Sequence, residues 1–441
     1  MRPPTGPRSS PTQRPRTWRR ISTRTELTHP QPLPQAGGGR GGTWLLLAAL
    51  FFLTTLVESL SWNQLAAYTP YYLRELGIGV SGVPGWTAAM ASLSWVIGIP
   101  LAPFWGVWAD RYSRKAVVVR SALVEAVIFA GWALSPNPEV ALTFRALSGF
   151  VLGNTGVMLA IQADATPKMK LGLAVGIVAG GAPAGRAIGP LIGAWLIRLV
   201  DVRGMLLFDA AASVAIAIAL TVLVQERPRA RRQVEPALKA LWAAVREIAS
   251  HGMVWRLFVA LGIIQLGFWT LAPFLPLVIQ HLGGYPTQAA AITSIGLVLS
   301  AMAAAQAVSS PLWGRLVDRF GAAPVLVTTS TIGCIAMLLA ARAGGLVALA
   351  GLLVAYGAAA AAVTATTMAL LASTVSEQRR GAVLGQVLFP FYLGGLFGPP
   401  IGAALYRVDP HVAFYVAGAC ALAPLLLLAG GLFRARAAQP V

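Results

Sequence analysis

The chain has 441 residues, of which 56% are hydrophobic and only 11% charged, and its formal net charge is +19. About a quarter of the residues of a soluble globular protein are charged, so this composition excludes that class and indicates an integral membrane protein. An excess of positive charge is also found in nucleic-acid-binding proteins, but the distribution of the charges along this chain has a different explanation.

Residues 1–42 are rich in Pro, Arg and Gly and contain no apolar core of the length that a secretory signal needs. We expect them to form a disordered cytoplasmic tail. From Trp44 onward, apolar runs of roughly 20 to 25 residues follow one another, and each is long enough to cross a hydrocarbon core of about 30 Å as a helix. The runs do not alternate in the way that barrel strands do.

The fold class that we predict is all-α and integral to the membrane, with twelve transmembrane helices in two pseudo-symmetric six-helix halves. The expected spans are 43–66, 85–108, 116–135, 139–163, 171–197, 204–224, 256–280, 287–312, 323–341, 345–371, 382–407 and 411–433. The N-terminal half is then 43–224 and the C-terminal half 256–433, with a cytoplasmic tail at 434–441. Between the halves, 225–255 reads as a basic linker followed by an amphipathic helix, which lies either on the membrane surface or against the bundle.

The placement of the Lys and Arg residues predicts the orientation of the chain. Of 34, 27 fall in or close to the even-numbered connections and the two tails, five fall in or close to the odd-numbered connections, and Arg145 and Arg186 lie deeper within predicted helices. Cytoplasmic loops carry such an excess, so both termini are expected in the cytoplasm and the protein in the plasma membrane. The basic charge is then explained by orientation and by attraction to anionic lipid, and no nucleic-acid partner is expected.

Three landmarks recur at nearly one offset, which indicates that the second half is a divergent copy of the first. "GVWADRY" at 106–112 returns as "GRLVDRF" at 314–320, and "GRAIGPLIG" at 185–193 has its counterpart around "GLFGPPIG" at 395–402. The third landmark is Pro70, Leu76 and Gly77 at the end of the first span, matched by Pro276, Leu282 and Gly283 at the end of the seventh. Many transporters consist of two such repeats with a binding site at their interface.

Charged residues gather at the end of the second predicted helix. Gly106 and Asp110 share one helical face there, so a neighbouring helix can approach the Gly and donate to the Asp. We interpret this cluster and its second-half copy as a conformational latch between helices; the simpler alternative is a helix end with basic side chains at the lipid headgroups. The predicted latch residues are Gly106, Asp110, Arg111, Arg114, Lys115, Gly314, Asp318 and Arg319.

A second motif places small residues every fourth position, on one face of the fifth and eleventh predicted helices, where a neighbouring helix can pack tightly. Pro190 removes one backbone hydrogen bond and is expected to bend its helix. The motif residues are Gly185, Gly189, Pro190 and Gly193, matched by Gly394, Gly398, Pro399 and Gly402.

These motifs resemble those of the major facilitator superfamily over about 390 of the 441 residues, and in particular its twelve-helix drug/proton antiporter branch. "GVWADRYSRK" is similar to the superfamily's loop signature, with Ser113 where Gly is usual. "LTFRALSGFVLG" at 142–153 resembles the arginine motif of helix four, with Arg145 in the matching position. "GRAIGPLIG" resembles the Gly-Pro signature that the family associates with antiport, which implies a seal against leak.

Five ionisable residues lie inside apolar spans, and each costs roughly 2.5 to 3.5 kcal/mol at mid-helix if unpaired. They must therefore face water or one another. Glu125 and Arg145 lie at similar depth on consecutive helices and are the first candidate pair, whereas Asp209 is expected to lie nearer the membrane surface. An Arg that approaches and leaves a carboxyl would make it release and reload a proton. The proton-coupling candidates are Glu58, Glu125, Arg145 and Asp209; a permanent structural ion pair is the alternative.

Polar and aromatic side chains of the first, seventh and eleventh predicted helices are candidates to line a substrate cavity. Arg186, which interrupts the glycine stripe, is a candidate contact for an anionic substrate. The cavity candidates are Glu58, Trp62, Asn63, Arg186, Gln265, Trp269, Phe389 and Tyr392.

The expected function is secondary active efflux of small amphipathic, drug-like molecules, coupled to protons, by alternating access. A porter for a sugar or an organic anion is the alternative within transport, and a non-transporting membrane scaffold is the alternative outside it. The sequence shows no nucleotide-binding loop, metal cluster or catalytic set, so we expect no enzyme activity, no cofactor and no metal. The expected partners are a small-molecule substrate, protons and the lipid bilayer, and the chain is expected to be a monomer.

The two predicted latches are unequal, because the second copy has Ala322 and Ala323 where the first has Arg114 and Lys115. Asp110→Asn is therefore expected to impair transport more than Asp318→Asn does. Initial transport rates of the two variants in proteoliposomes, at matched amounts of inserted protein, measure the difference. Equal losses would contradict the inequality of the latches.

Overall fold

The computed structural model describes residues 43–111, 113–151, 153–225, 246, 248–250, 252–374 and 388–425. Within these ranges every regular element is a helix. The predicted tails at 1–42 and 434–441, most of the predicted linker 225–255, and residues 382–387 of the eleventh predicted span lie outside the described residues.

The helices of the N-terminal half correspond to the first six predicted spans. They are α1 (Thr43–Glu75), α2 (Val83–Arg111), α3 (Arg114–Leu134), α4 (Pro138–Ala146), the 3₁₀ turn η1 (Leu147–Phe150), α5 (Asn154–Ala165), the 3₁₀ turn η2 (Lys168–Lys170) and α6 (Leu171–Leu223). The C-terminal half contains α8 (Gly252–Leu271), the 3₁₀ turn η3 (Ala272–Phe274), α9 (Leu275–Leu282), α10 (Gln288–Phe320), α11 (Ala322–Ala340), α12 (Leu346–Thr374), α14 (Leu388–Val408) and α15 (Val412–Ala421).

Local sequence signals account for several helix boundaries. The Ser113 hydroxyl accepts a hydrogen bond from the Ala116 N–H and caps α3, and Asn137, followed by Pro138, caps α4 in the same way. Helix α6 continues through Pro190 and is interrupted at Asp201, whose φ of 72° and ψ of −177° are not helical. Asp201 Oδ1 accepts from the Gly204 N–H at 2.7 Å. The interruption separates the fifth and sixth predicted spans.

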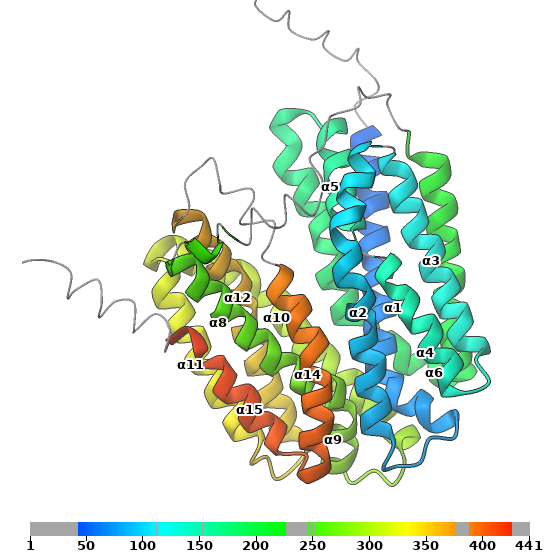
Figure 1. Ribbon diagram of the computed structural model, residues 1–441, viewed down its shortest axis with the longest axis vertical. Coiled ribbons are helices and arrows are strands. Elements are labelled where there is room, and N and C mark those ends of the chain that lie inside the picture. The colour runs from blue at the N-terminus through cyan, green and yellow to red at the C-terminus, as the bar shows by residue number, and fades with distance from the viewer. Residues whose placement is uncertain are drawn as a thin grey trace, which may run out of the picture. The chain divides into compact units, whose positions relative to one another are not determined.

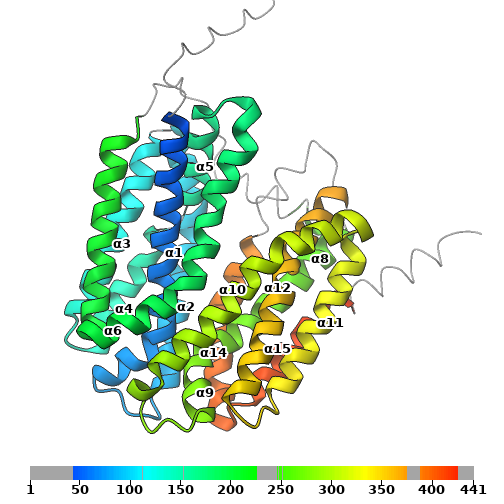
Figure 2. The same cartoon turned by 180° about the vertical axis from the view of Figure 1, so that it is seen from behind.

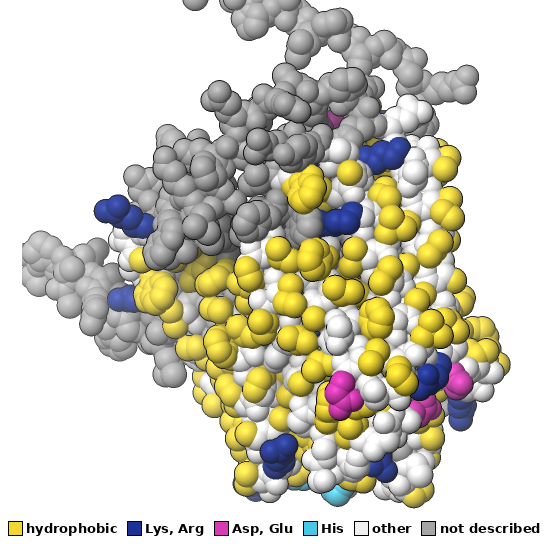
Figure 3. Space-filling view, turned by 45° about the vertical axis from the view of Figure 1, so that its right-hand side comes forward, with side chains coloured by type: hydrophobic (Ala, Val, Ile, Leu, Met, Phe, Trp, Pro, Cys, Tyr) yellow, Lys and Arg dark blue, Asp and Glu magenta, His cyan; other side chains and the backbone are white. Residues whose placement is uncertain are grey.

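Eight helical segments in the described part are long and apolar enough to cross a membrane. They are 44–75, 114–134, 138–165, 168–223, 252–282, 289–320, 322–340 and 346–371. The segment 168–223 includes the interruption at Asp201. Figure 3 shows hydrophobic side chains over the middle of one face, with Lys, Arg, Asp and Glu toward its two ends. The chain is thus a multi-pass, all-helical membrane protein.

The glycine motifs lie at the closest helix contacts in both halves. A side-chain carbon at Gly185 of α6 would meet the Leu56 carbonyl oxygen and lie 2.9 Å from the Leu60 nitrogen, both in the backbone of α1. In the second half, a side-chain carbon at Gly398 of α14 would lie 2.6 Å from Trp269 Cβ in α8. The corresponding helices of the two halves therefore pack in the same way, which supports the repeat seen in the sequence.

The two halves meet through α2 with α14 and through α6 with α10. The Tyr68 hydroxyl of α1 lies 2.6 Å from the Pro190 carbonyl oxygen and 3.3 Å from the Ile292 carbonyl oxygen of α10. A side-chain carbon at Gly296 would lie 2.8 Å from that same hydroxyl. Figures 1 and 2 show the helices of each half side by side, with the α1–α2 and α9–α10 connections at one end. We call this the closed end, because Tyr68, Ile292 and Gly296 lie toward it.

The glycine contact predicts a difference between two alanine substitutions in α6. Gly185→Ala forces a methyl group against the α1 backbone, which costs about 1 to 3 kcal/mol, as overpacking does. Gly176 has nothing within 4 Å of its missing side chain, so Gly176→Ala is the matched control. Gly185→Ala is expected to lower the apparent melting temperature in detergent by several degrees, and Gly176→Ala to leave it nearly unchanged. Equal effects would contradict the close approach of α6 to α1.

Candidate functional site

Three acidic side chains come together inside the N-terminal half, one each from α1, α3 and α6. Glu125 is 4% exposed and Asp209 is fully buried, and Glu58 is half-buried. Glu125 interacts electrostatically with both of the other two. We call Glu58, Glu125 and Asp209 the carboxyl cluster.

Neutral hydrogen-bond donors hold the carboxyl cluster. Asn154 Nδ2 donates to Glu58 Oε2 at 2.7 Å. The Ser61 hydroxyl lies 3.0 Å from Asp209 Oδ1, and the Ser213 hydroxyl lies 3.3 Å from Glu125 Oε2. The bond to Ser61 places Asp209 about one helical turn from Glu58, on the side of the closed end, because α1 runs toward that end. That Asp209 lies nearer the membrane surface than Glu58 stays a prediction.

The predicted pair of Glu125 and Arg145 is not formed, and this correction has a clear geometric cause. Arg145 Nε donates to the Met90 carbonyl oxygen of α2 at 2.8 Å. The guanidinium lies over the Trp62 ring, 4.8 Å from its centroid. In the described residues no ion pair reaches a carboxyl of the cluster. Similar depth on consecutive helices did not bring the two side chains together, because Arg145 is directed toward α2 and Trp62 rather than toward α3.

Arg186 and Asn63 have separate environments at the α6 surface. The Arg186 side chain is exposed, and its Nη1 donates across the two halves to Gln306 Oε1 of α10 at 3.3 Å. Asn63 Nδ2 donates back to the Ser59 carbonyl oxygen at 2.6 Å, and its Cβ lies beside Gly189. Arg186 therefore belongs to the interface between halves rather than to the carboxyl cluster.

Four aromatic rings meet where α2 contacts α8 and α14, and we call them the aromatic cluster: Trp95, Trp269, Phe391 and Tyr392. The Trp95 ring centroid lies 5.7 Å from that of Trp269, 5.6 Å from that of Phe391 and 5.3 Å from that of Tyr392. Trp269 and Tyr392 were predicted; Trp95 and Phe391 were not, because each stands in an apolar run without a distinguishing signal.

The remaining cavity candidates lie on α8 and α14. Gln265 packs against Gly394, one turn before Trp269. Phe389 lies near the start of α14, three residues before Tyr392, and is 36% exposed. Both are thus on the helices that carry the aromatic cluster.

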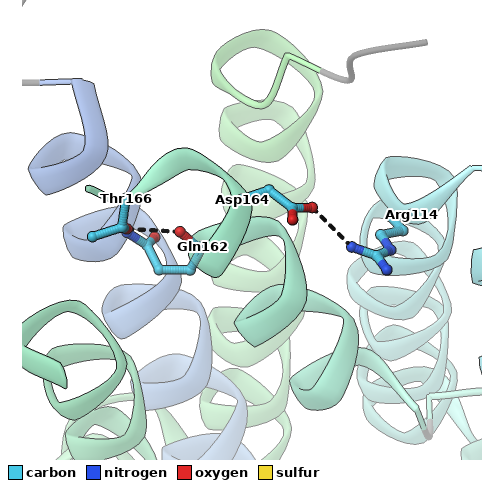
Figure 4. A network of polar contacts seen from close by, with 4 residues as sticks. All are labelled: Arg114, Gln162, Asp164 and Thr166. Atoms are coloured by element: carbon cyan, nitrogen blue, oxygen red, sulfur yellow. Dashed lines mark hydrogen bonds and ion pairs between the residues drawn. The ribbon is translucent and has the colours of Figure 1, made fainter. Parts of the chain in front are cut away.

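The predicted latch is partly visible at the end of the N-terminal half opposite the closed end. Arg114 Nη1 lies 3.1 Å from Asp164 Oδ2 of α5 (Figure 4). In the same view, Gln162 Nε2 donates to the Thr166 hydroxyl at 2.9 Å. Lys115 Nζ donates to the Thr221 carbonyl oxygen of α6 at 2.6 Å. The side chains of Gly106, Asp110 and Arg111 lie outside the described part of the structure.

The second-half copy of the latch differs from the expectation. Nothing lies within 4 Å of where a Gly314 side chain would start, and Asp318 and Arg319 are exposed. Among the described residues the close helix approach predicted at Gly314 is therefore not seen, although α12 reaches the residue before it: Trp313 Nε1 donates to the Ala358 carbonyl oxygen at 2.6 Å.

The sequence profile of the Major Facilitator Superfamily matches residues 47–294 and 257–441 of the chain. The chain belongs to the major facilitator superfamily. As a member it is a transporter of small molecules rather than an enzyme.

Two similar proteins carry multidrug resistance in their names, and one of them is named an efflux pump. The multi-drug resistance efflux pump PmrA of Streptococcus pneumoniae serotype 4 is 28% identical over 359 residues, which cover 80% of this chain and 88% of that protein. The multidrug resistance protein MdtG of Citrobacter koseri is 29% identical over 300 residues, covering 67% and 72%.

Solved structures of superfamily members share the fold. The crystal structure of the nucleoside transporter NupG superposes with a TM-score of 0.68 at 17% identity, over 88% of this chain and 98% of that one. A bacterial homologue of the human lysosomal transporter Spinster, described as inward-facing and unoccupied, gives 0.69 at 15% identity over 89% and 96%.

The sequence alone did not identify the uncharged hydrogen-bond donors that contact the carboxyl cluster. Ser61, Asn154 and Ser213 lie in membrane-spanning helices, and small polar residues are common there as ordinary helix contacts. The only signal for these three residues would be their closeness to an acidic residue on a neighbouring helix. That closeness depends on how the helices pack, which the sequence does not give.

The carboxyl cluster predicts an effect of pH on stability. A carboxylate buried without a cation is destabilising when ionised, and Gln keeps an acceptor for Ser213 without the charge. Glu125→Gln is expected to raise the apparent melting temperature in detergent by a few degrees at pH 9 and to change it little at pH 5. Glu139→Gln is the control, since Glu139 is exposed. A lower melting temperature of Glu125→Gln at pH 9 would contradict the absence of a cationic partner.

Proposed function

We propose that the protein is a proton-coupled exporter of small amphipathic molecules, and that it works by alternating access. The observation that supports this best is the carboxyl cluster. Three acidic groups on three helices, held by neutral donors, would be costly in an inert bundle. They are reasonable in a transporter that must take up and release protons within the membrane.

The neutral donors support reversible protonation. Ser and Asn side chains satisfy a carboxyl oxygen in either protonation state, whereas a fixed Arg would hold the carboxyl ionised. Glu58, which is half-buried, is the member of the cluster best placed to exchange protons with water. We assign Glu58 as the exchanging group, with Glu125 and Asp209 as its electrostatic neighbours.

Arg145 has a positioning role in this proposal. Its guanidinium lies over Trp62 and bonds the backbone of α2, and α2 also contacts the C-terminal half. A movement of α2 would therefore change the position of this positive charge relative to the cluster. This gives a route by which the rearrangement of the halves alters the proton affinity of the site.

We also propose the topology. We divide α6 at Asp201 and count α4 with α5 as one span and α8 with α9 as another. Counted in this way, the described helices support twelve spans in two halves. The basic residues place both termini in the cytoplasm of a plasma-membrane protein, so the closed end is extracellular. The latch residues at the opposite end would then hold or release the cytoplasmic face, the glycine motif would seal against leak, and the chain would act as a monomer.

An organic-anion porter is the second candidate, and Arg186 is the observation that favours it. Its side chain is exposed between the halves and donates only to a neutral Gln in the described contacts. An anion would be a stronger acceptor for it than an amide. The names of the relatives favour the exporter of drugs instead.

Neutralising Glu58 tests the coupling. In proteoliposomes with an internal pH dye, addition of ethidium is expected to cause proton movement with the wild-type protein, and Glu58→Gln is expected to reduce its initial rate at least tenfold. Glu139→Gln, an exposed acid near the closed end, should stay within twofold of wild type. Retained coupling in Glu58→Gln would remove that residue from the mechanism. Proton movement with benzoate or glucose, and none with ethidium, would favour the second candidate.

A further inference from the structure

The aromatic cluster is asymmetric: one ring comes from the N-terminal half and three from the C-terminal half. Trp95 on α2 lies nearly parallel to Tyr392, with 28° between the ring planes, and meets Trp269 and Phe391 edge-on at 73° and 83°. These are the arrangements in which aromatic pairs attract one another. The Trp95 indole thus has an aromatic ring on its face and two at its edges, all supplied by the other half.

The C-terminal half is shaped to admit this indole. A side-chain carbon at Gly395 would collide with the Trp95 ring, so the absence of a side chain there lets the ring reach the backbone of α14. Gly395 follows Gly394, the glycine of the motif that packs on Gln265 of α8, and is turned about 100° around the helix axis from it, toward Trp95 of α2. We call the space bounded by Gly395, Trp269, Phe391 and Tyr392 the aromatic slot.

The slot differs from the aromatic core of the N-terminal half. Trp132 and Phe129 are fully buried, whereas Trp95, Trp269, Phe391 and Tyr392 all keep partial exposure. The slot rings are therefore accessible from outside the packed interior. Trp95 also lies far from the start of its helix: it is the thirteenth residue of α2, which at about 1.5 Å per residue is about 18 Å from Val83.

We propose that the aromatic slot is a subsite for flat aromatic ring systems, and that Trp95 displaces such a ring when the halves close. This rests on the proposed alternating access. When α2 and α14 separate, Trp95 leaves with the N-terminal half and the slot stays with the C-terminal half. A flat substrate ring takes the position of the indole, and reinsertion of Trp95 removes it. The faces of the slot rings also attract a positive charge on the substrate.

The consequence for transport is directional. The slot cannot hold Trp95 and a substrate ring together, so closure of the extracellular face requires the ring to leave the slot. In an exporter this competition opposes rebinding of a released ring from the outside while the extracellular face closes. The proposal identifies Trp95 as a specificity-determining residue that acts by competition with the substrate.

Competition and ordinary packing give opposite results on substitution. Purified full-length protein in detergent is titrated with radiolabelled ethidium, a flat aromatic cation, and with radiolabelled tetrabutylammonium, a cation without rings. Trp95→Ala is expected to tighten ethidium binding about three- to tenfold, since it removes the competing ring, and Trp95→Phe to tighten it less. Phe391→Ala, which removes a slot ring, is expected to weaken ethidium binding about three- to tenfold. Tetrabutylammonium binding should change less than twofold in each.

The control is Trp195→Ala, because Trp195 is a 61% exposed Trp of the N-terminal half on α6; it should change neither ligand. Weaker ethidium binding in Trp95→Ala, or equal changes for both cations, would overturn the slot proposal. Its failure is distinguishable from failure of the proposed function. Binding is measured without a proton gradient, whereas absence of ethidium-driven proton movement in wild-type proteoliposomes contradicts the exporter itself.

Discussion

The close approach of α6 to α1 is the contact on which the N-terminal site depends. Gly181, Gly185 and Gly189 bring the two backbones together without intervening side chains. Because α6 then continues past Asp201 and returns along the bundle, its second segment places Asp209 against Ser61 and Ser213 against Glu125. A larger side chain in the stripe would separate the helices and with them the carboxyl groups. The glycines are thus part of the site, although none contacts a carboxyl.

The same packing serves a different chemistry in the other half. Gly394, Gly398 and Gly402 bring α14 onto α8 as the first set brings α6 onto α1. What lies beside this contact is aromatic rather than acidic: Trp269 from α8 and Phe391 and Tyr392 from α14. The repeat therefore preserved helix packing while the side chains next to it diverged. This division agrees with the proposal that protons are handled in one half and a substrate ring in the other.

The two halves contact each other mainly through α2 with α14 and α6 with α10, and three of these four helices carry a residue of the carboxyl cluster or the aromatic cluster. Helix α2 bears Trp95 and provides the carbonyl oxygen that holds Arg145. Helix α6 bears Asp209 and Arg186, and Arg186 reaches Gln306 of α10. In the proposed mechanism, a rocking movement at these contacts would alter the carboxyl cluster and the aromatic cluster together. That would link the proposed ion site to the proposed substrate site, as coupled transport requires.

The sequence by itself determined the membrane class, the order of the helices, the repeat and the family, because these follow from apolar length, charge placement and motifs that are local in the chain. It also identified all three acids of the carboxyl cluster, since a charge in an apolar run is conspicuous. Only the tertiary structure decided which groups meet. Arg145 contacts Trp62 and Met90 instead of Glu125, Asp209 meets Ser61, and Trp95 lies between the halves. The reason is that the packing of the helices sets how far each one is rotated about its axis, and this rotation determines which neighbour a side chain faces. Neither the depth of a residue in its span nor the hydropathy of the span specifies the rotation.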